Sequence, residues 1–416
     1  MAFELLLSYQ HNVQAFLLRH ADKYSGVIIP LSVATAFQEG TDGFIRALCK
    51  VSPNKTYMID PRSPLFQSTW DRESKREAHE KMAAQLGRVV VSTLAAGRPL
   101  EVADFDEDAV EDMVRVSLGF QLEFGRKNNA KLKKYAKLAG VDVELLGVLS
   151  NPRRLIPPYF RFVNTNDPWY EISLILIEAA QEHLDSLGGE LQKELCPVLH
   201  VRGLSDDLDW REIAGELAAR QIENCFVYPN NFREADATVA ELQRYRSAVE
   251  GIAEFGLSCY SLHGGYFAAM LSKFGLAGFG NGVGYGEWRD SSYHRGGQAN
   301  VRIYIPKLHR FVQANEALIL LSDFGDFFAE DSDLLSSLLR TGGSALSVTT
   351  EQANDHFLEC RAAEQEFLNA SNLDAVRGEL QSTVEGIASV LGRCSPAGKA
   401  LANRYSDTLV RWVQAI

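Results

Sequence analysis

The chain has 416 residues, of which 46% are hydrophobic and 23% are charged, so it is long enough to bury a large core and most of it is not disordered. The formal net charge of −12 argues against a surface that coats nucleic acid as a whole, although it leaves room for a local basic groove. Six scattered cysteines without a C-x-x-C pair indicate neither a zinc cluster nor a disulfide framework, and they predict a reducing, cytoplasmic setting.

The first twenty residues, MAFELLLSYQHNVQAFLLRH, contain an apolar LLL run without a basic start, and Glu4 interrupts the apolar residues early. This pattern predicts an amphipathic helix and not a signal peptide. We expect no membrane span, because no run of about 18 apolar residues occurs in the sequence.

Eight short apolar runs, each followed by turn residues, predict eight strands that are mostly buried on both faces. The runs are residues 26–33, 56–60, 159–164, 194–201, 224–229, 257–264, 276–288 and 301–308. Helical patterns over 168–189, 210–223 and 237–256 separate several of these runs. Strand followed by helix, repeated about eight times, predicts an α/β fold built as a (β/α)₈ TIM-type barrel. An open doubly wound sheet is the alternative, which the lack of a G-x-G-x-x-G motif after the first strand disfavours.

Two helical segments fall outside this alternation. We expect residues 72–150 to form a helical insertion subdomain and residues 321–416 to form a C-terminal helical cap. The barrel then consists of residues 1–71, with two strands, and residues 151–320, with the other six. The insertion ends in a basic run, GRKNNAKLKKYAKLAG, at 125–140.

The stretch YMIDPRSPLFQ places a carboxylate at the end of a buried strand, which is where the active sites of α/β barrels lie. Asp60 is partly desolvated there, and Pro61 and Pro64 restrict the backbone that follows it. Such a carboxylate suits proton transfer or attack on an electrophilic carbon, so Asp60 is our first catalytic candidate. The alternative is that Asp60 starts a turn or caps the following helix.

The segment GFGNGVGYGEWRD has five glycines in ten residues, which would let a ligand lie against the backbone. Glu287 follows directly and is the second catalytic candidate. If it faces Asp60, the two carboxylates form the usual apparatus for cleaving a glycosidic bond. The alternative is a tight turn or bulged strand whose glycines only permit close packing.

Further candidates for substrate binding lie at the predicted strand ends: Arg62, His200, Asn230, Asn231, His263, Gly284, Arg289 and His309. For His263, a structural role is the alternative. Candidates for contacts to phosphate groups come from the basic run and the last barrel loop: Arg126, Lys127, Lys131, Lys134, Lys307 and Arg310. An ordinary solvated surface is the alternative for them. The sequence indicates neither a metal site nor a cofactor.

With these residues in hand, the chain resembles the tRNA-guanine transglycosylase superfamily. In that family a barrel strand ends in Asp-Ser-Gly-Gly-aromatic-Gln, and here Asp60 is followed, after a two-residue insertion, by Ser-Pro-Leu-Phe-Gln at 63–67. The family also has a Gly-Gly-Leu-Ala-Val-Gly-Glu strand, and GVGYGE at 282–287 looks like a relaxed version. The resemblance covers about 20–75 and 150–315.

The chain departs from this family in two ways. The family's zinc site of three cysteines and a histidine is absent, and the position of its late-strand nucleophilic aspartate falls near Arg302 and Pro306, where no aspartate stands. Apart from these two departures, the chain is similar to divergent branches of the superfamily that act on DNA, namely base-exchange enzymes and phage-defence DNA glycosylases. This resemblance implies base flipping, a base stacked on Phe66 with Gln67 beside it, and rupture of the N-glycosidic bond.

The sequence therefore leads to the hypothesis of a cytoplasmic DNA glycosylase that removes a modified base in antiviral defence, with DNA as partner, no cofactor and an open oligomeric state. Base exchange on DNA or tRNA is one alternative. A barrel hydrolase or lyase of a small metabolite is a second, and a non-catalytic interaction module is a third.

Overall fold

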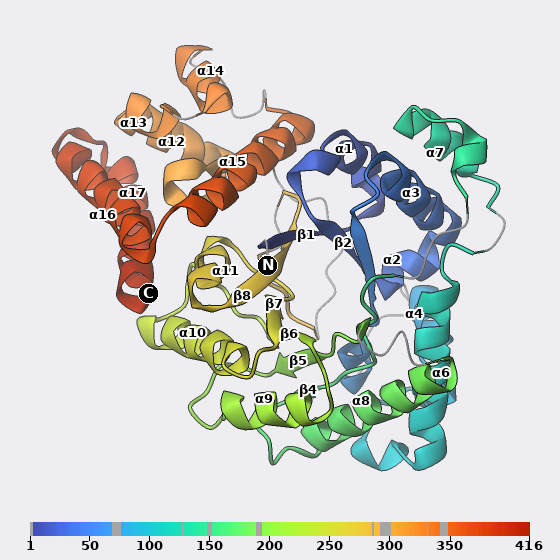
Figure 1. Ribbon diagram of the computed structural model, residues 1–416. Helices are drawn as coiled ribbons and strands as arrows, with labels where there is room; N and C mark the ends of the chain where they lie inside the picture. Colours follow the sequence, from blue (N-terminus) through green and yellow to red (C-terminus); the bar gives the residue numbers. More distant parts are fainter. Residues whose placement is uncertain are drawn as a thin grey trace.

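The computed structural model describes residues 3–68, 76–126, 129–147, 152–188, 194–284, 287–291, 301–330, 332–341 and 348–416. Its centre is an eight-stranded, all-parallel sheet with the strand order β3-β2-β1-β8-β7-β6-β5-β4. The strands are β1 (Glu4–Ser8), β2 (Gly26–Pro30), β3 (Thr56–Asp60), β4 (Arg161–Phe162), β5 (Val198–Val201), β6 (Asn224–Pro229), β7 (Ser258–Ser261) and β8 (Leu276–Gly282). The sheet curls inside a surrounding layer of helices, which confirms the predicted (β/α)₈ TIM-type barrel (Figure 1).

Helices follow the barrel strands in the order that a barrel requires. They are α1 (Gln14–Arg19), α2 (Leu31–Ala36), α3 (Gln38–Val51), α8 (Pro168–Ser186), α9 (Trp210–Ala219), α10 (Val239–Ala253) and α11 (Tyr266–Met270). Side-chain caps begin several of them: Asp167 caps α8, Asp209 caps α9, and Thr238 forms a capping box with Glu241 in α10.

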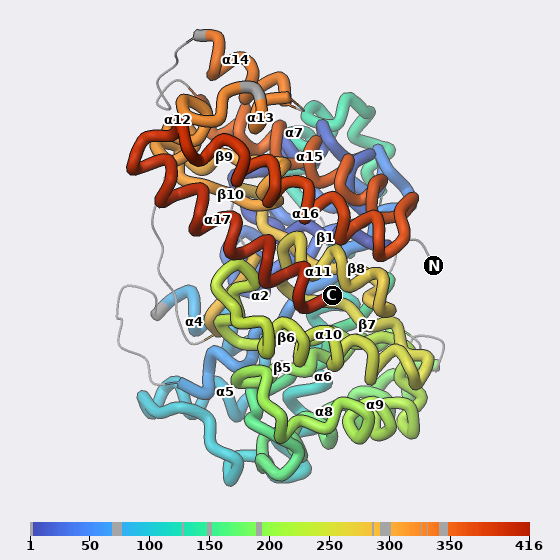
Figure 2. The backbone as a smooth tube through the Cα atoms, turned by 90° about the vertical axis from the view of Figure 1, so that its left-hand side faces the viewer, coloured from blue at the N-terminus to red at the C-terminus, as the bar shows by residue number. Residues whose placement is uncertain are grey.

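The helical insertion between β3 and β4 and the C-terminal helical extension are both present, as predicted. The insertion comprises α4 (Arg76–Ala83), α5 (Arg88–Ala95), α6 (Glu107–Glu123) and α7 (Leu132–Ala139). The extension comprises α12 (Ala314–Phe324), α13 (Asp326–Ala329), α14 (Asp333–Thr341), α15 (Thr350–Ala370), α16 (Leu373–Val390) and α17 (Pro396–Ala415). The extension lies beside the barrel, where α17 packs on α10 and α15 packs on a small antiparallel hairpin (Figures 1 and 2). None of the helices in the described part of the chain has the length and apolar character that a bilayer crossing requires.

One helix prediction and one strand prediction were wrong. The N-terminal segment begins with strand β1, which pairs with β2 and β8, and only residues after Gln10 turn into helix. The predicted eighth strand, 301–308, lies outside the barrel, because it forms the hairpin β9 (Arg302–Ile305) and β10 (Arg310–Gln313). The barrel therefore has eight strands, but Asp60 ends the third and the glycine-rich run forms the eighth.

The interior of the barrel is filled by apolar side chains, and polar groups lie above them toward the carboxyl ends of the strands. Leu6, Ile28, Met58, Val198 and Phe226 belong to a buried inner cluster that is separate from the large core under the helices. Because side chains alternate along a strand, the residue two positions beyond an inner residue also faces inward. Asp60 stands two positions after Met58, and His200 and Tyr228 stand in the same relation to Val198 and Phe226. These three form the next layer toward the carboxyl ends of the strands.

Side chains join the two edge strands of the curled sheet. The Ser63 hydroxyl donates to the Tyr159 carbonyl (2.5 Å) and accepts from the Tyr159 N–H (2.9 Å). The Gln67 amide bonds both the carbonyl (3.0 Å) and the N–H (2.8 Å) of Arg161. Since β3 and β4 share no ladder in the described sheet, Ser63 and Gln67 satisfy backbone groups that a neighbouring strand would otherwise pair. The stretch after Asp60 therefore closes the barrel.

Candidate active site

Asp60 is held at the carboxyl end of β3 by donors from both edges of the sheet. Its side chain is buried, and Oδ1 accepts from the Tyr159 hydroxyl at 2.8 Å and from the Arg62 backbone N–H at 3.0 Å. The Arg62 guanidinium Nε lies 3.4 Å from Oδ2. Arg62 has a left-handed backbone (φ 51°), which turns its side chain back onto the aspartate, and such strain in a non-glycine residue is typical of functional sites. Burial and the charge of Asp60 raise the pKa of Tyr159 well above its ordinary value, so the phenol remains a donor.

A second carboxylate, Asp290, reaches the same place from the chain beyond β8. The Tyr228 hydroxyl donates to the Arg289 carbonyl at 3.2 Å, and Asn230 accepts from the Ser291 N–H at 2.8 Å. The Asn230 amide also donates to Asp290 Oδ1 at 3.3 Å. These bonds fix residues 289–291 over the end of β6, across the barrel from Asp60.

Asp60 and Asp290 line one pocket at the barrel mouth. Its described lining consists of Asp60, Arg62, Pro64, Leu65, Tyr159, Tyr228, His263, Arg289, Asp290 and Ser291. Its cavity volume is only about 20 Å³. That is room for one or a few ordered waters. We refer to it as the mouth pocket.

Two neutral histidines lie at this pocket and under it. Burial lowers the pKa of His263, which lines the pocket, to about 4, and the nearby Arg62 charge acts in the same direction. Burial likewise lowers the pKa of His200 to about 3, and its ring stacks on Tyr228 with centroids 4.1 Å apart. His263 Nε2 and His200 Nδ1 are buried and have no hydrogen-bond partner among the residues that the structure describes. Buried polar atoms are rarely left unpaired, so His263 offers a ring nitrogen to a ligand of the mouth pocket.

Glu287 does not join Asp60 in the mouth pocket, contrary to the expected carboxylate pair. Its carboxylate lies 3.5 Å from the guanidinium of Arg361 on α15, and Arg361 also pairs with Glu364 at 2.8 Å. Burial raises the pKa of Glu287, and the Arg361 charge opposes that rise. Glu287 thus belongs to a buried charge network between the barrel and the C-terminal helices, and the second carboxylate of the pocket is Asp290.

Four other predicted substrate contacts also lie elsewhere. Phe66 is 2% exposed and belongs to the main hydrophobic core, so its ring is not presented for stacking, while Gln67 is engaged with the β4 backbone. A side chain at Gly284 would approach Asn354 of α15 to 3.0 Å, which places this glycine at the helical extension. His309 lies between Glu364 (2.6 Å) and Glu379 (3.1 Å), where its ring stacks on Tyr266.

The other predicted contacts are gathered around the mouth. Arg62, His263 and Arg289 line the pocket, and His200 and Asn230 lie at its base and rim. The Asn231 N–H donates to the Arg289 carbonyl at 2.8 Å, so Asn231 helps to hold the segment that carries Asp290. Asp290, Tyr159 and Tyr228 complete the site. The sequence places Asp290 at a predicted strand end beside Arg289 but favours Glu287 as the second carboxylate, and neither tyrosine is among the sequence candidates.

The predicted phosphate contacts fall into two groups. Lys131 and Lys134 lie near His11, which stands three residues beyond β1. Burial and the charges of these two lysines lower the pKa of His11. Arg126 pairs with Glu123 at 3.4 Å, and Lys127 lies outside the described residues. The second group faces the helical extension: Lys307 pairs with Glu330 at 3.1 Å, and Arg310 lies 4.8 Å from the ring of Tyr405.

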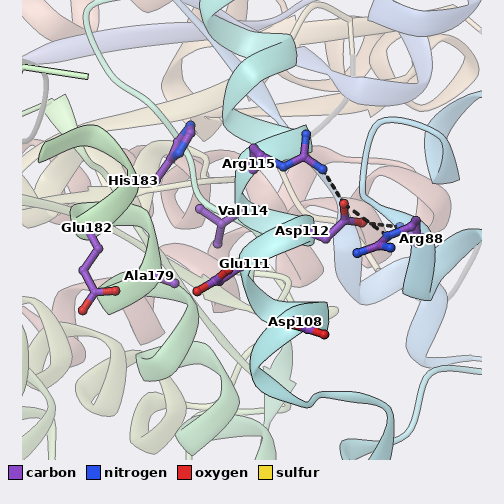
Figure 3. Close-up of a pocket in the computed structure, with 9 residues that line it drawn as sticks. All are labelled: Arg88, Asp108, Glu111, Asp112, Val114, Arg115, Ala179, Glu182 and His183. Atoms are coloured by element: carbon purple, nitrogen blue, oxygen red, sulfur yellow. Dashed lines mark hydrogen bonds and ion pairs between the residues drawn. The ribbon is translucent and has the colours of Figure 1, made fainter. Parts of the chain in front are cut away.

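A separate surface hollow lies between α5, α6 and α8 (Figure 3). Asp112 receives the Arg88 backbone N–H at 2.7 Å and pairs with Arg115 at 2.5 Å. His183, on the opposite wall, stands in the last turn of α8. Since α8 begins after the carboxyl end of β4 and runs back along the barrel, this hollow is remote from the strand ends that carry barrel active sites. Among the described residues, no group of three or more His, Cys, Asp or Glu side chains is arranged to hold a metal ion.

No protein-family model and no curated protein sequence matches this chain. Among solved structures, it is similar to SrfJ from Salmonella typhimurium, with 10% identity and a TM-score of 0.36 over 68% of this chain and 64% of the SrfJ chain. It is also similar to a putative fructose-1,6-biphosphate aldolase from Coccidioides immitis, with 9% identity and a TM-score of 0.31 over 92% of this chain and 91% of that one. For D-psicose 3-epimerase the identity is 11% and the TM-score 0.29, over 69% of this chain and 90% of that one.

Proposed function

We propose that this protein is an enzyme that breaks an N-glycosidic bond in nucleic acid, and that it removes a modified base from DNA in the mouth pocket. The observation that carries the proposal is the meeting of Asp60 and Asp290 in one narrow pocket at the carboxyl ends of the strands. Two carboxylates on either side of a sugar are the usual means of stabilising an oxocarbenium-like transition state and activating water.

The contacts of the two carboxylates suggest different roles. Asp60 has three donors around it and is fixed in place, so it would stabilise positive charge as it develops on the sugar. Asp290 receives the Asn230 amide and would take a proton from the attacking water. In this step the water oxygen bonds to C1′, and the C1′–N bond breaks with its electron pair leaving on the base. The water proton passes to Asp290, and the base takes up a proton from solvent. Neutral His263 would bind a polar edge of the base.

Nucleic acid as the substrate is supported by the position of α7. This helix packs on α3, and its fully buried Tyr135 donates to Gln14 Oε1 at 2.8 Å. Gln14 stands shortly after β1, so the lysines of α7 are displayed near the carboxyl ends of the strands. Basic side chains at this end of the barrel would attract phosphates to a protein that is otherwise acidic.

The tightness of the mouth pocket favours a second candidate, a barrel hydrolase or lyase that acts on a small metabolite. A cavity of about 20 Å³ does not admit a nucleobase. Entry of a nucleotide would require residues 289–291 to move away from Tyr228 and Asn230. A small substrate would need less movement of these residues than a nucleotide would. Base exchange would need more room than hydrolysis, because a second base must enter the pocket.

Phage DNAs that carry different modified bases provide the test. The protein is incubated with each DNA, and mass spectrometry identifies free bases while an abasic-site probe detects the remaining sugar. Release of one base by the wild type, and its loss in Asp60→Asn, supports the proposal. If no base is released from any DNA, or if Asp60→Asn releases it at the wild-type rate, the proposed function is refuted.

A further inference from the structure

A large groove rich in arginine lies between the barrel and the helical extension. Its five arginines come from three parts of the chain: Arg233 after β6, Arg302 and Arg310 on the β9–β10 hairpin, and Arg404 and Arg411 on α17. The volume of this groove is about 530 Å³, compared with about 20 Å³ for the mouth pocket. The hairpin and α17 lie close together in Figure 2, and Arg310 of the hairpin bonds Thr408 of α17, so these segments, distant in sequence, form one surface. We call it the arginine groove.

The positive charge of the arginine groove is only partly neutralised. Three acids also line it: Asp236, Glu316 and Asp407. Glu316 pairs with Arg404 at 2.7 Å, and Asp236 lies 3.8 Å from Arg233.

Two arginines of the groove have neutral partners. Arg310 donates to the Thr408 hydroxyl at 3.3 Å, and Arg411 donates to the Ala235 carbonyl at 2.7 Å. Neither of them forms an ion pair within the described part of the chain. In a protein with a net charge of −12, this concentration of guanidinium groups indicates a site for an anion.

The arginine groove adjoins the mouth pocket. The Arg233 guanidinium lies 3.7 Å from the centre of the Trp288 ring, and the next two residues, Arg289 and Asp290, line the mouth pocket. Asn230, which anchors Asp290, is three residues before Arg233 on the same loop. A ligand that extends out of the mouth pocket across residues 288–290 therefore enters the groove.

We propose that the arginine groove binds phosphate groups of the DNA strand on one side of the nucleotide in the mouth pocket. This inference rests on the proposed function, because it takes DNA as the ligand. Arginine suits the role because its planar guanidinium bonds phosphate through two N–H groups. Stacking of Arg233 on Trp288 and of Arg310 on Tyr405 orients the guanidinium groups before a ligand arrives, which lowers the entropy lost on binding.

The test measures binding separately from catalysis. Fluorescence anisotropy follows a short labelled DNA strand bound to full-length protein between about 50 and 200 mM salt. The groove variant carries Arg233→Gln and Arg302→Gln, and its matched control carries Arg98→Gln and Arg115→Gln. The control arginines lie in the α5–α6 region, which Figure 2 places far from α17, β9 and β10. Thermal melting verifies that both variants fold. A third variant, Arg233→Lys, retains the positive charge and tests whether charge alone is sufficient.

We expect the groove variant to bind on the order of tenfold more weakly for each arginine removed, with a salt slope smaller by about 0.7 per lost contact. The control and Arg233→Lys should keep the wild-type slope. Equal binding by wild type and groove variant, or no binding of the strand by the wild type at the lowest salt, overturns the inference. Binding of ATP, tested as a free phosphate compound, by protein that does not bind the DNA strand also overturns the inference, because the groove would then serve a small anion. Base release is measured in the same samples and tests the proposed function separately. If DNA binding depends on the arginines but no base is released, only the catalytic proposal is refuted.

Discussion

The hydroxyl of Tyr159 lies 2.8 Å from Oδ1 of Asp60, which joins a residue just before β4 to the last residue of β3. The backbone of the same tyrosine is bonded by the Ser63 side chain. Closure of the barrel and placement of the carboxylate therefore depend on one set of contacts. The turn after Asp60 therefore carries, at Ser63 and Gln67, the side chains that join the two edge strands.

Asparagine at either carboxylate of the mouth pocket should abolish most of the activity. We expect Asp60→Asn and Asp290→Asn each to lower the rate of base release on the order of 10²–10⁴-fold, because each removes a negative charge that acts on the sugar or the water. Single-turnover kinetics measure the chemical step. Glu287→Gln is the comparison, since Glu287 pairs with Arg361 outside the pocket. If Glu287→Gln lowers the rate of base release as much as Asp290→Asn does, Asp290 is not the specific partner of Asp60 in the reaction.

Breaking the side-chain closure between β3 and β4 should destabilise the barrel. Gln67→Leu leaves the Arg161 carbonyl and N–H without partners, and we expect a loss of about 1–3 kcal/mol in the free energy of unfolding for each group left buried. Ser63→Ala should cost a similar amount and should also slow base release, because it frees the backbone that holds Tyr159. Urea denaturation measures both effects. Ser92→Ala, at an exposed serine of α5, should change stability by less than about 0.5 kcal/mol. Unchanged stability in Gln67→Leu would contradict the closing role.

Local sequence patterns were sufficient to place one side of the site. Asp60 ends a continuous apolar run that a turn must follow, and the barrel rule then places Asp60, Arg62 and His263 at the same end of the sheet. Arg289 and Asn230 follow from the same reasoning. The structure brings all of these together at the mouth.

The other half depends on contacts between distant segments. Glu287 and Asp290 are three residues apart, and Asp290 enters the pocket because Tyr228 and Asn230, on another strand, bond its neighbours. No pattern within 278–290 contains that information.

Two element predictions failed for related reasons. The run Glu4–Ser8 is too short for its apolar residues to distinguish strand from helix. The run 301–308 does contain a strand, but Pro306 and the left-handed backbone of His309 reverse the chain into a hairpin.

Replacing Arg361 should be much more damaging than replacing an exposed arginine. Arg361 is fully buried and neutralises Glu364 and Glu287 between the barrel and α15. Arg361→Met leaves Glu287 without its paired guanidinium and Glu364 with His309 as its remaining cationic partner, so we expect a loss of about 3–5 kcal/mol in the free energy of unfolding. Arg211→Met removes an exposed pair with Glu254 and should cost at most about 1 kcal/mol. Equal losses in the two variants, measured by urea denaturation, would contradict the buried network.

His309 should make the stability of the protein depend on pH above neutrality. Burial alone lowers the pKa of its ring, but hydrogen bonds and charges from Glu364 and Glu379 outweigh burial and raise the pKa to about 9. The folded state thus holds a proton that the unfolded state, with a pKa of about 6.5, releases earlier. The resulting stabilisation is fully present below pH 6.5 and is lost as the pH rises to about 9. The rise in the pKa of His309 from 6.5 to about 9 corresponds to a stabilisation of about 3 kcal/mol.

The variant His309→Asn isolates this effect, because asparagine tolerates the left-handed backbone at this position (φ 51°). The difference in unfolding free energy between wild type and His309→Asn should be largest near pH 6 and should shrink steadily toward pH 9. His183→Asn, on the surface hollow of α8, is the control and should show no such trend above pH 6.5, since burial lowers the pKa of His183. A wild-type advantage over His309→Asn that stays constant from pH 6 to pH 9 would mean that the histidine is neutral between the two glutamates.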